Sequence, residues 1–166
     1  NNNEVIKDLS TPLGAVRLTK MFFEGGLITD EGIIKCKEYI LSIINNQILT
    51  VFNKENIDKF AATSGTVFTT LQILERKEAG TYLQSLNGGI IKSDKLFRLE
   101  ELILSKRTIE ERLNIKGLEQ KRADIYPAGL LILTSIFQAF NIHKLYVSTY
   151  AMREGMVLRY QKNIQF

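Results

Sequence analysis

The chain has little of what metal cages and disulfides require. Its 166 residues include one cysteine, Cys36, and one histidine, His143. A single cysteine cannot form an internal disulfide, and one residue of each type cannot build a tetrahedral zinc site. A reducing, cytoplasmic setting is therefore expected. Cys36 lies in a helical pattern and is expected to be a buried structural thiol, whereas His143 is expected in a surface turn.

Long apolar runs and blocks of like charge are also missing. The most apolar stretch, residues 128–140, is too short to span a membrane and contains Thr134, Ser135 and Gln138, so it predicts a buried helix. The basic residues are scattered, which argues against a DNA-binding tail. The net charge of +4 and a pI near 9.1 suit a phosphate-rich ligand, although an ordinary solvated basic surface is the simpler explanation.

The remaining composition is that of one globular domain, which we assign to residues 1–166. Hydrophobic residues make up 45% and charged residues 24%. Strands are expected at residues 4–9, 59–62, 90–92 and 144–147, and helices at residues 13–23, 30–52, 67–77, 93–104, 108–117, 125–140 and 150–160. The alternation of helices and strands predicts an α/β fold with parallel strand pairing.

A small-residue turn, Ser64-Gly65-Thr66, connects an expected strand to an expected helix. Glycine lets the backbone approach a ligand, and the amides at a helix start point toward an anion. The same residue types also occur where a strand and a helix merely pack. Both interpretations of this turn stay open at this point.

Arg122 stands just before the apolar helix, and its planar guanidinium suits phosphate oxygens. It can equally form a loop-stabilising pair with Asp124, which is itself expected to cap the helix rather than to act as a base. Ser93 is expected to cap the helix over residues 93–104. Arg17 lies among apolar neighbours, and a structural ion pair is its expected role. Glu111 is expected to complete a capping box at the start of the helix over residues 108–117.

Four motifs in this order resemble the second half of the exopolyphosphatase/guanosine pentaphosphate phosphohydrolase family (Ppx/GppA). They are LGAVRLT at residues 13–19, ATSGT at 62–66, RADIYPAG at 122–129 and STYAMREG at 148–155. That family belongs to the fold group of actin, the sugar kinases and Hsp70. The resemblance therefore implies the second, RNase H-like domain of an actin-like ATPase fold.

The departures from the family pattern matter as much as the match. Family members carry an earlier actin-like domain with a catalytic glutamate, and an aspartate-isoleucine-glycine-glycine-glycine-serine loop just before the region where this chain begins. Neither is present, so the chain resembles a C-terminal fragment that is incomplete at its N-terminal hairpin. The lost strand would lie between the strands near Val5 and Ala61, leaving two bare edges. We expect one of three outcomes. The Val5 strand slides into the gap, a second copy of the chain donates a strand, or the chain is ordered only beside its missing half.

The resemblance implies part of a phosphohydrolase that removes terminal phosphate from inorganic polyphosphate or the 5′-phosphate of guanosine pentaphosphate (pppGpp), an activity of the stringent response. Ser64, Gly65 and Thr66 would form the cleft wall and Arg122 an anion contact. Mg²⁺ is expected in the parent enzyme, with its ligands mostly outside this chain. The chain alone is expected to have no turnover.

Two other functions compete with this hypothesis. One is a non-catalytic module that senses a phosphorylated nucleotide or a partner with half an actin-like fold. The other, weaker because of the RADIYPAG and STYAMREG motifs, is a relative of the sugar or acetate kinases. The expected partners are polyphosphate or pppGpp, the missing N-terminal domain, and a second copy in a homodimer. No membrane and no DNA are expected.

Overall fold

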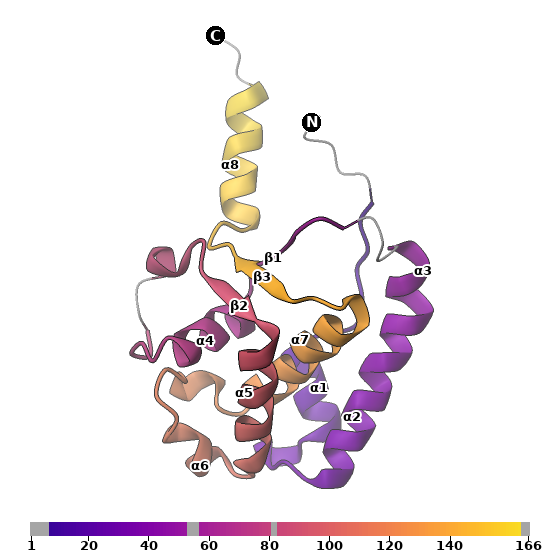
Figure 1. Ribbon diagram of the computed structural model, residues 1–166, viewed down its shortest axis with the longest axis vertical. Coiled ribbons are helices and arrows are strands. Elements are labelled where there is room, and N and C mark those ends of the chain that lie inside the picture. The colour runs from indigo at the N-terminus through magenta and orange to yellow at the C-terminus, as the bar shows by residue number, and fades with distance from the viewer. Residues whose placement is uncertain (1–6, 53–56, 81–82, 164–166) are drawn as a thin grey trace.

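One buried helix, α7 (Tyr126–Phe140), forms the centre of the computed structural model, which describes residues 7–52, 57–80 and 83–163. Most side chains of α7 are buried, and helices α1, α2, α4 and α5 all pack against it (Figure 1). Its sequence is mostly apolar, as expected of a helix largely surrounded by protein. The helix ends at Asn141, whose φ of 52° is a left-handed conformation that asparagine tolerates.

The other elements follow the expected order along the chain. They are α1 (Ala15–Phe22), η1 (Glu24–Gly26), α2 (Asp30–Ile43), η2 (Ile44–Ile48), α3 (Leu49–Val51), β1 (Phe60–Ala62), α4 (Gly65–Leu74), η4 (Leu83–Leu86), β2 (Ile90–Lys92), α5 (Ser93–Ser105), α6 (Ile109–Leu113), η5 (Gln120–Arg122), β3 (Lys144–Val147) and α8 (Met152–Asn163). The long helix expected over residues 30–52 is confirmed as α2, η2 and α3, with a π-helical turn in the middle.

The sheet has three described strands in the order β1-β3-β2. β1 runs parallel to β3, with Phe60 opposite Leu145 and Ala62 opposite Val147. β2 runs antiparallel to β3, so the expected parallel pairing holds for one of the two pairs. The other edge of β1 pairs with no strand among the described residues, and the expected gap stays a prediction. Val5 lies outside the described residues, so the three ways of filling that gap stay predictions.

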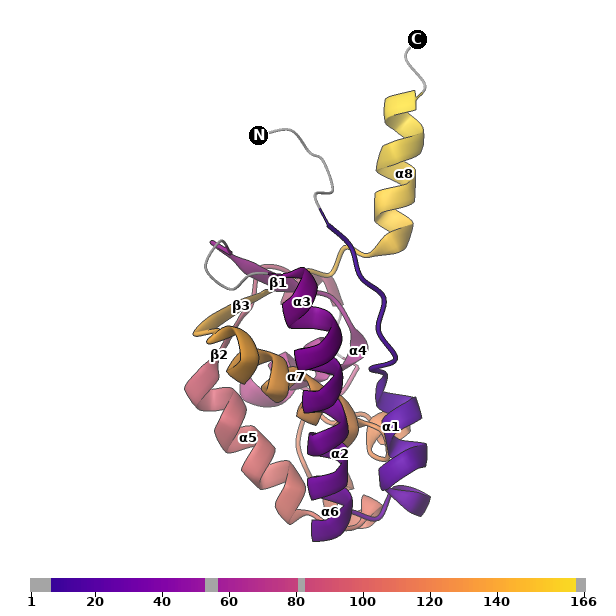
Figure 2. The same ribbon diagram turned by 90° about the vertical axis from the view of Figure 1, so that its right-hand side faces the viewer.

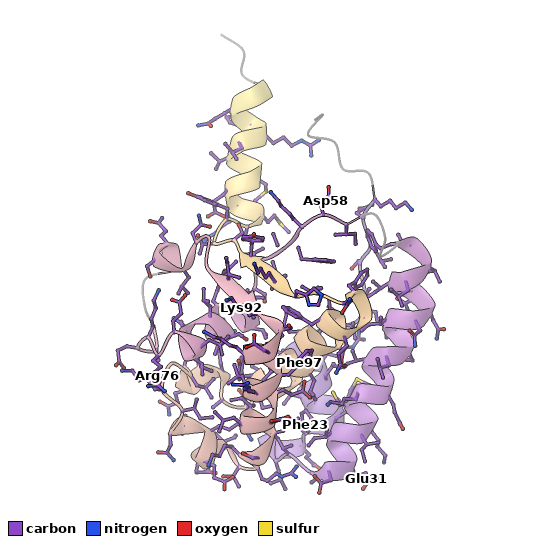
Figure 3. The ribbon with its side chains drawn as sticks, viewed as in Figure 1. Phe23, Glu31, Asp58, Arg76, Lys92 and Phe97 are labelled. Atoms are coloured by element: carbon purple, nitrogen blue, oxygen red, sulfur yellow. The ribbon has the colours of Figure 1, made fainter. Side chains whose placement is uncertain are left out.

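Two hydrophobic clusters share α7. The larger lies under the sheet and joins α7 to α4 and α5; the smaller joins α7 to α1 and α2. Phe23 belongs to the smaller cluster and is 1% exposed, whereas Glu31 and Arg76 lie at the periphery (Figure 3). Cys36 is fully buried in the same cluster, and burial raises the pKa of its thiol to about 12. The expectation of a structural thiol is confirmed, because a thiol that stays protonated is a poor nucleophile.

Several expected boundaries and caps are wrong. Lys7, Asp8 and Leu9 form no strand, and the helix expected over residues 108–117 ends at Leu113. Ser93 is the first residue of α5 rather than its cap, because the polypeptide turns into the helix at Lys92. The capping box of Thr108 and Glu111 is confirmed. The Glu111 amide donates to the Thr108 hydroxyl at 3.3 Å, and the Thr108 amide donates to the Glu111 carboxylate at 2.9 Å.

Asp124 does not cap α7. The position before the helix is Ile125, which offers no side-chain acceptor. Asp124 instead lies near the buried guanidinium of Arg112, and its charge helps to keep that guanidinium protonated against the burial that lowers its pKa. His143 is exposed in the turn before β3, as expected.

Helix α8 stands away from the body (Figures 1 and 2). Its large apolar side chains, Met152, Met156, Val157, Leu158 and Tyr160, are each more than half exposed. The Arg153 Nη2 atom lies 3.9 Å from Glu154 Oε1, which fits the expected local pairing.

Candidate functional site

A cavity of about 1010 Å³ lies where α1, the start of α4 and the start of α7 meet. All four residues singled out in the sequence, Ser64, Gly65, Thr66 and Arg122, line this cavity. They come from segments more than fifty positions apart in the chain, and the fold brings them together at one end of the cavity. We call the place where Ser64, Gly65, Thr66 and Arg122 meet the corner. Their grouping is a finding of the structure; their role in binding stays a prediction.

The turn before α4 is held by a side-chain cap. Ser64 has extended backbone angles, and its hydroxyl oxygen accepts a hydrogen bond of 3.2 Å from the amide of Val67. The amides of Gly65 and Thr66 make no hydrogen bond within the described part of the chain. Such free amides at the start of a ten-residue helix carry partial positive charge and suit an anion.

Gly65 lies directly against Arg122. A Cβ atom on Gly65 would collide with both terminal nitrogens and the Cζ atom of the Arg122 guanidinium. Only glycine therefore allows this arginine to lie flat on the start of α4. The arrangement places a cation beside the two free amides.

Arg122 is supported on its other side by Glu119. The Arg122 Nε atom is 3.8 Å from Glu119 Oε2, which is also 3.0 Å from Lys121 Nζ. The alternative of an Arg122–Asp124 pair is wrong, since no ion pair joins these two residues. Within the described residues the terminal nitrogens of Arg122 have no hydrogen-bond acceptor. They remain free to donate to a ligand.

Gly129 brings α7 and α1 close to the same turn. A Cβ atom at Gly129 would collide with the Thr66 hydroxyl and lie 3.2 Å from Ala15 Cβ. Behind the turn, the buried hydroxyls of Thr70 and Tyr126 are 3.0 Å apart and join α4 to α7. Burial raises the pKa of Tyr126, so this phenol remains a neutral hydrogen-bonding group. The corner is thus fixed by packing from three helices.

The charges lining the cavity have one sign. Arg17, Lys20 and Arg122 line it, and no aspartate or glutamate does among the residues that the structure describes. Arg17 is exposed and forms no ion pair with any described residue, so its expected structural pairing is wrong. It faces the cavity because α1 turns its apolar Leu18 toward the core instead. Val16, Met21 and Ile132 also line the cavity and give it apolar surface.

A residue that sequence reasoning missed lies beneath the corner. Arg112 is 0% exposed and donates hydrogen bonds only to main-chain carbonyls. Its acceptors are Ala123 (2.7 Å), Lys106 (2.8 Å), Arg107 (3.2 Å) and Gly26 (2.5 Å). Helical periodicity could not reveal this, because a charged residue in a short amphipathic helix is normally assigned to the solvent face.

The described side chains around the cavity do not form a metal site. The described residues contain no group of three His, Cys, Asp or Glu side chains that could hold one. The donor set around the cavity is cationic and hydroxylic, which does not suit Mg²⁺. Among the described residues no helix is long and apolar enough to cross a membrane.

Comparison with known proteins identifies the family. The model of the Ppx/GppA phosphatase family matches residues 1–164. The chain belongs to the Ppx/GppA phosphatase family. This confirms the resemblance drawn from the four motifs.

Two curated relatives are about twice as long as this chain or longer. A Haemophilus influenzae protein named "Putative exopolyphosphatase" is 31% identical over 97% of this chain and 49% of its own length. A guanosine-5′-triphosphate,3′-diphosphate pyrophosphatase of Photobacterium profundum is 27% identical over 89% of this chain and 28% of its own length. The chain thus spans half or less of these relatives.

Solved structures of the family share the fold. A crystal structure of the Aquifex aeolicus family member has a TM-score of 0.81 at 22% identity, covering 98% of this chain and 51% of that one. An exopolyphosphatase from Cytophaga hutchinsonii has a TM-score of 0.79 at 19% identity, covering 99% of this chain and 53% of that one. The expected actin-like α/β fold is confirmed.

Proposed function

We propose that this chain forms the phosphate-binding wall of a phosphohydrolase that acts on inorganic polyphosphate or on pppGpp. The observation that carries the proposal is the corner of Gly65 and Arg122. Among the described residues, a guanidinium with free donors lies there on a helix start with free amides, in a cavity lined by cations and no carboxylate. Membership of the Ppx/GppA phosphatase family supports phosphohydrolysis as the chemistry.

The terminal phosphoryl group would occupy this corner. Its oxygens would accept hydrogen bonds from the amides of Gly65 and Thr66 and from the terminal nitrogens of Arg122. These donors can also stabilise the charge of the transferring group, because they already lie together at the start of α4. The exposed cations Arg17 and Lys20 would attract the remainder of an extended anion by long-range electrostatics.

The attacking water needs a base from outside the cavity wall. None of the lining residues is an aspartate, glutamate or histidine, so the described wall contains a binding surface without a general base. We propose that the base belongs to another part of a longer protein and that the 166-residue chain binds without turnover. One edge of β1 has no partner strand among the described residues, which supports the further proposal that this chain associates, with that other part or as a homodimer.

One observation favours a second function. A cavity with cations and no base also fits a non-catalytic module that senses a phosphorylated nucleotide. The two functions differ in what the whole gene-encoded protein does with its ligand. A sensor would bind the anion and leave it intact.

The test is phosphate release by the whole gene-encoded protein that contains this chain, with polyphosphate and pppGpp offered separately. The 166-residue chain is assayed alongside for both release and binding. Release by the whole protein only, with binding by both, would support the phosphohydrolase. Binding by both without release would support the sensor.

A matched pair of variants ties the result to the corner. Arg122→Met removes the proposed phosphate contact, while Arg98→Met removes an exposed arginine of α5 outside the cavity. Loss of about tenfold or more in tripolyphosphate affinity is expected for the first, because a charge-assisted hydrogen bond is lost. Equal affinities of the two variants would contradict the proposed site.

A further inference from the structure

Arg112 lies outside the cavity lining and holds the main chain beside it. Its Nε atom donates to the carbonyl of Ala123, the residue directly after Arg122. Its terminal nitrogens donate to Lys106, Arg107 and Gly26, which belong to two other loops. One guanidinium thus joins three loops by their backbones.

The bond to Ala123 acts on a short and stiff piece of chain. The amide of Arg122 donates to the carbonyl of Glu119 at 2.9 Å, and that of Ala123 to Gln120 at 3.2 Å. Ala123 is 0% exposed, so it cannot shift without disturbing the core. The backbone of Arg122 is therefore held by the turn on one side and by the anchored Ala123 on the other.

We infer that Arg112 is a positioning residue, which keeps the guanidinium of Arg122 on Gly65 and thereby sets the affinity of the corner for phosphate. Arg112 does so without touching the ligand. The inference rests on the proposed function, since it concerns the same site. Binding groups must be held within about 0.5 Å of their productive place to act fully.

The geometry explains why this position requires arginine. The guanidinium is flat and carries five N–H donors in a fixed, forked arrangement. Here it makes four hydrogen bonds, each to a different main-chain carbonyl. A lysine would keep the charge but offers three donors from one tetrahedral nitrogen. It cannot reach carbonyls on three loops from one point. Arg112→Lys therefore tests the forked donor geometry while it keeps the positive charge.

A double-mutant cycle on the 166-residue chain tests the inference, with tripolyphosphate affinity measured by calorimetry. Arg122→Met is expected to lower the affinity at least about tenfold, and Arg112→Lys about fivefold to tenfold. In the Arg122→Met background, Arg112→Lys should change the affinity less than about twofold, because the group that it positions is gone. Equal effects of Arg112→Lys in both backgrounds would overturn the inference.

A matched control variant distinguishes the positioning role of Arg112 from a general contribution to stability. Ile40→Val removes a buried methyl group from the smaller cluster, away from the cavity lining. It should lower the unfolding midpoint and leave the tripolyphosphate affinity unchanged. If Ile40→Val weakened binding as much as Arg112→Lys does, loss of stability alone would explain both.

A measurement on the wild-type chain covers the case in which Arg112→Lys does not fold. Hydrogen exchange at the Arg112 Nε is expected to be slow and to slow further, by about tenfold, at saturating tripolyphosphate. Binding and the intact bond to Ala123 would then be thermodynamically linked. Exchange that does not respond to the ligand would overturn the inference.

The cycle also separates this inference from the proposed function. If the wild-type chain does not bind tripolyphosphate, or Arg122→Met binds as well as wild type, the proposed site fails and the inference with it. If Arg122→Met weakens binding while Arg112→Lys does not, only the positioning role fails.

Discussion

Two arginines ten positions apart have opposite surroundings in this fold. Arg112 is 0% exposed, and its donors are taken up by four carbonyls of the protein. Arg122 is about one third exposed, and its terminal nitrogens face a cavity without a protein acceptor among the described residues. The first guanidinium is satisfied by the fold and the second is left for a ligand. The comparison shows that a free donor set, rather than charge alone, marks the candidate site.

The largest expected effect is on stability, and it belongs to the satisfied arginine. Arg112→Met leaves buried carbonyls without donors, and we expect the free energy of unfolding to fall by at least about 3 kcal/mol. Arg122→Met removes a partly exposed side chain and should cost less than about 0.5 kcal/mol. Urea unfolding of both variants measures the difference. Similar losses would show that both arginines support the fold.

The second effect is on binding and comes from the contact between Gly65 and Arg122. Gly65→Ala adds a Cβ atom where the guanidinium lies, and the flexible end of the arginine can move aside. We therefore expect little change in stability but a loss of about tenfold in tripolyphosphate affinity. Gly155→Ala in α8, whose added Cβ meets nothing within 4 Å, is the control. An unaltered affinity of Gly65→Ala would mean that the placement of Arg122 is unimportant.

A third effect tests whether the corner depends on close packing of α7. Gly129→Ala pushes against the hydroxyl of Thr66, and such overpacking costs about 1–3 kcal/mol. Thr66→Ala in the same chain should restore most of the lost stability, because it removes the colliding oxygen. Thermal unfolding of the single and double variants checks this. Failure of the second substitution to rescue the first would show that the strain lies elsewhere.

The residues that line the cavity could be selected from the sequence, whereas the residue that supports them could not; binding by the cavity residues stays a prediction. Ser64, Gly65, Thr66 and Arg122 were selected because their types suit an anion at a helix start, and the fold does bring them to one cavity. Arg112 was missed because its burial depends on carbonyls from three loops.

The same limit explains the errors at Arg17 and Asp124. An ion pair was expected for the first and a helix cap for the second, since both are local and common roles. Their actual surroundings are set by tertiary contacts: the cavity beside α1 and the buried Arg112 beside the start of α7. Periodicity gave the order of helices and strands, because that order depends on each segment's own apolar face. Partners distant in the chain leave no such pattern.

The smallest expected effect concerns the exposed cations of the cavity. Arg17→Ala and Lys20→Ala should each lower tripolyphosphate affinity about threefold at low salt, because both act through solvent. At about 0.5 M salt these losses should vanish, since screening acts over a few ångströms. The loss caused by Arg122→Met should persist there, because direct hydrogen bonds are screened much less. If the Arg122→Met effect also vanished with salt, Arg122 would act as one more surface cation. Arg122 would then not differ from Arg17 and Lys20 in how it binds the anion.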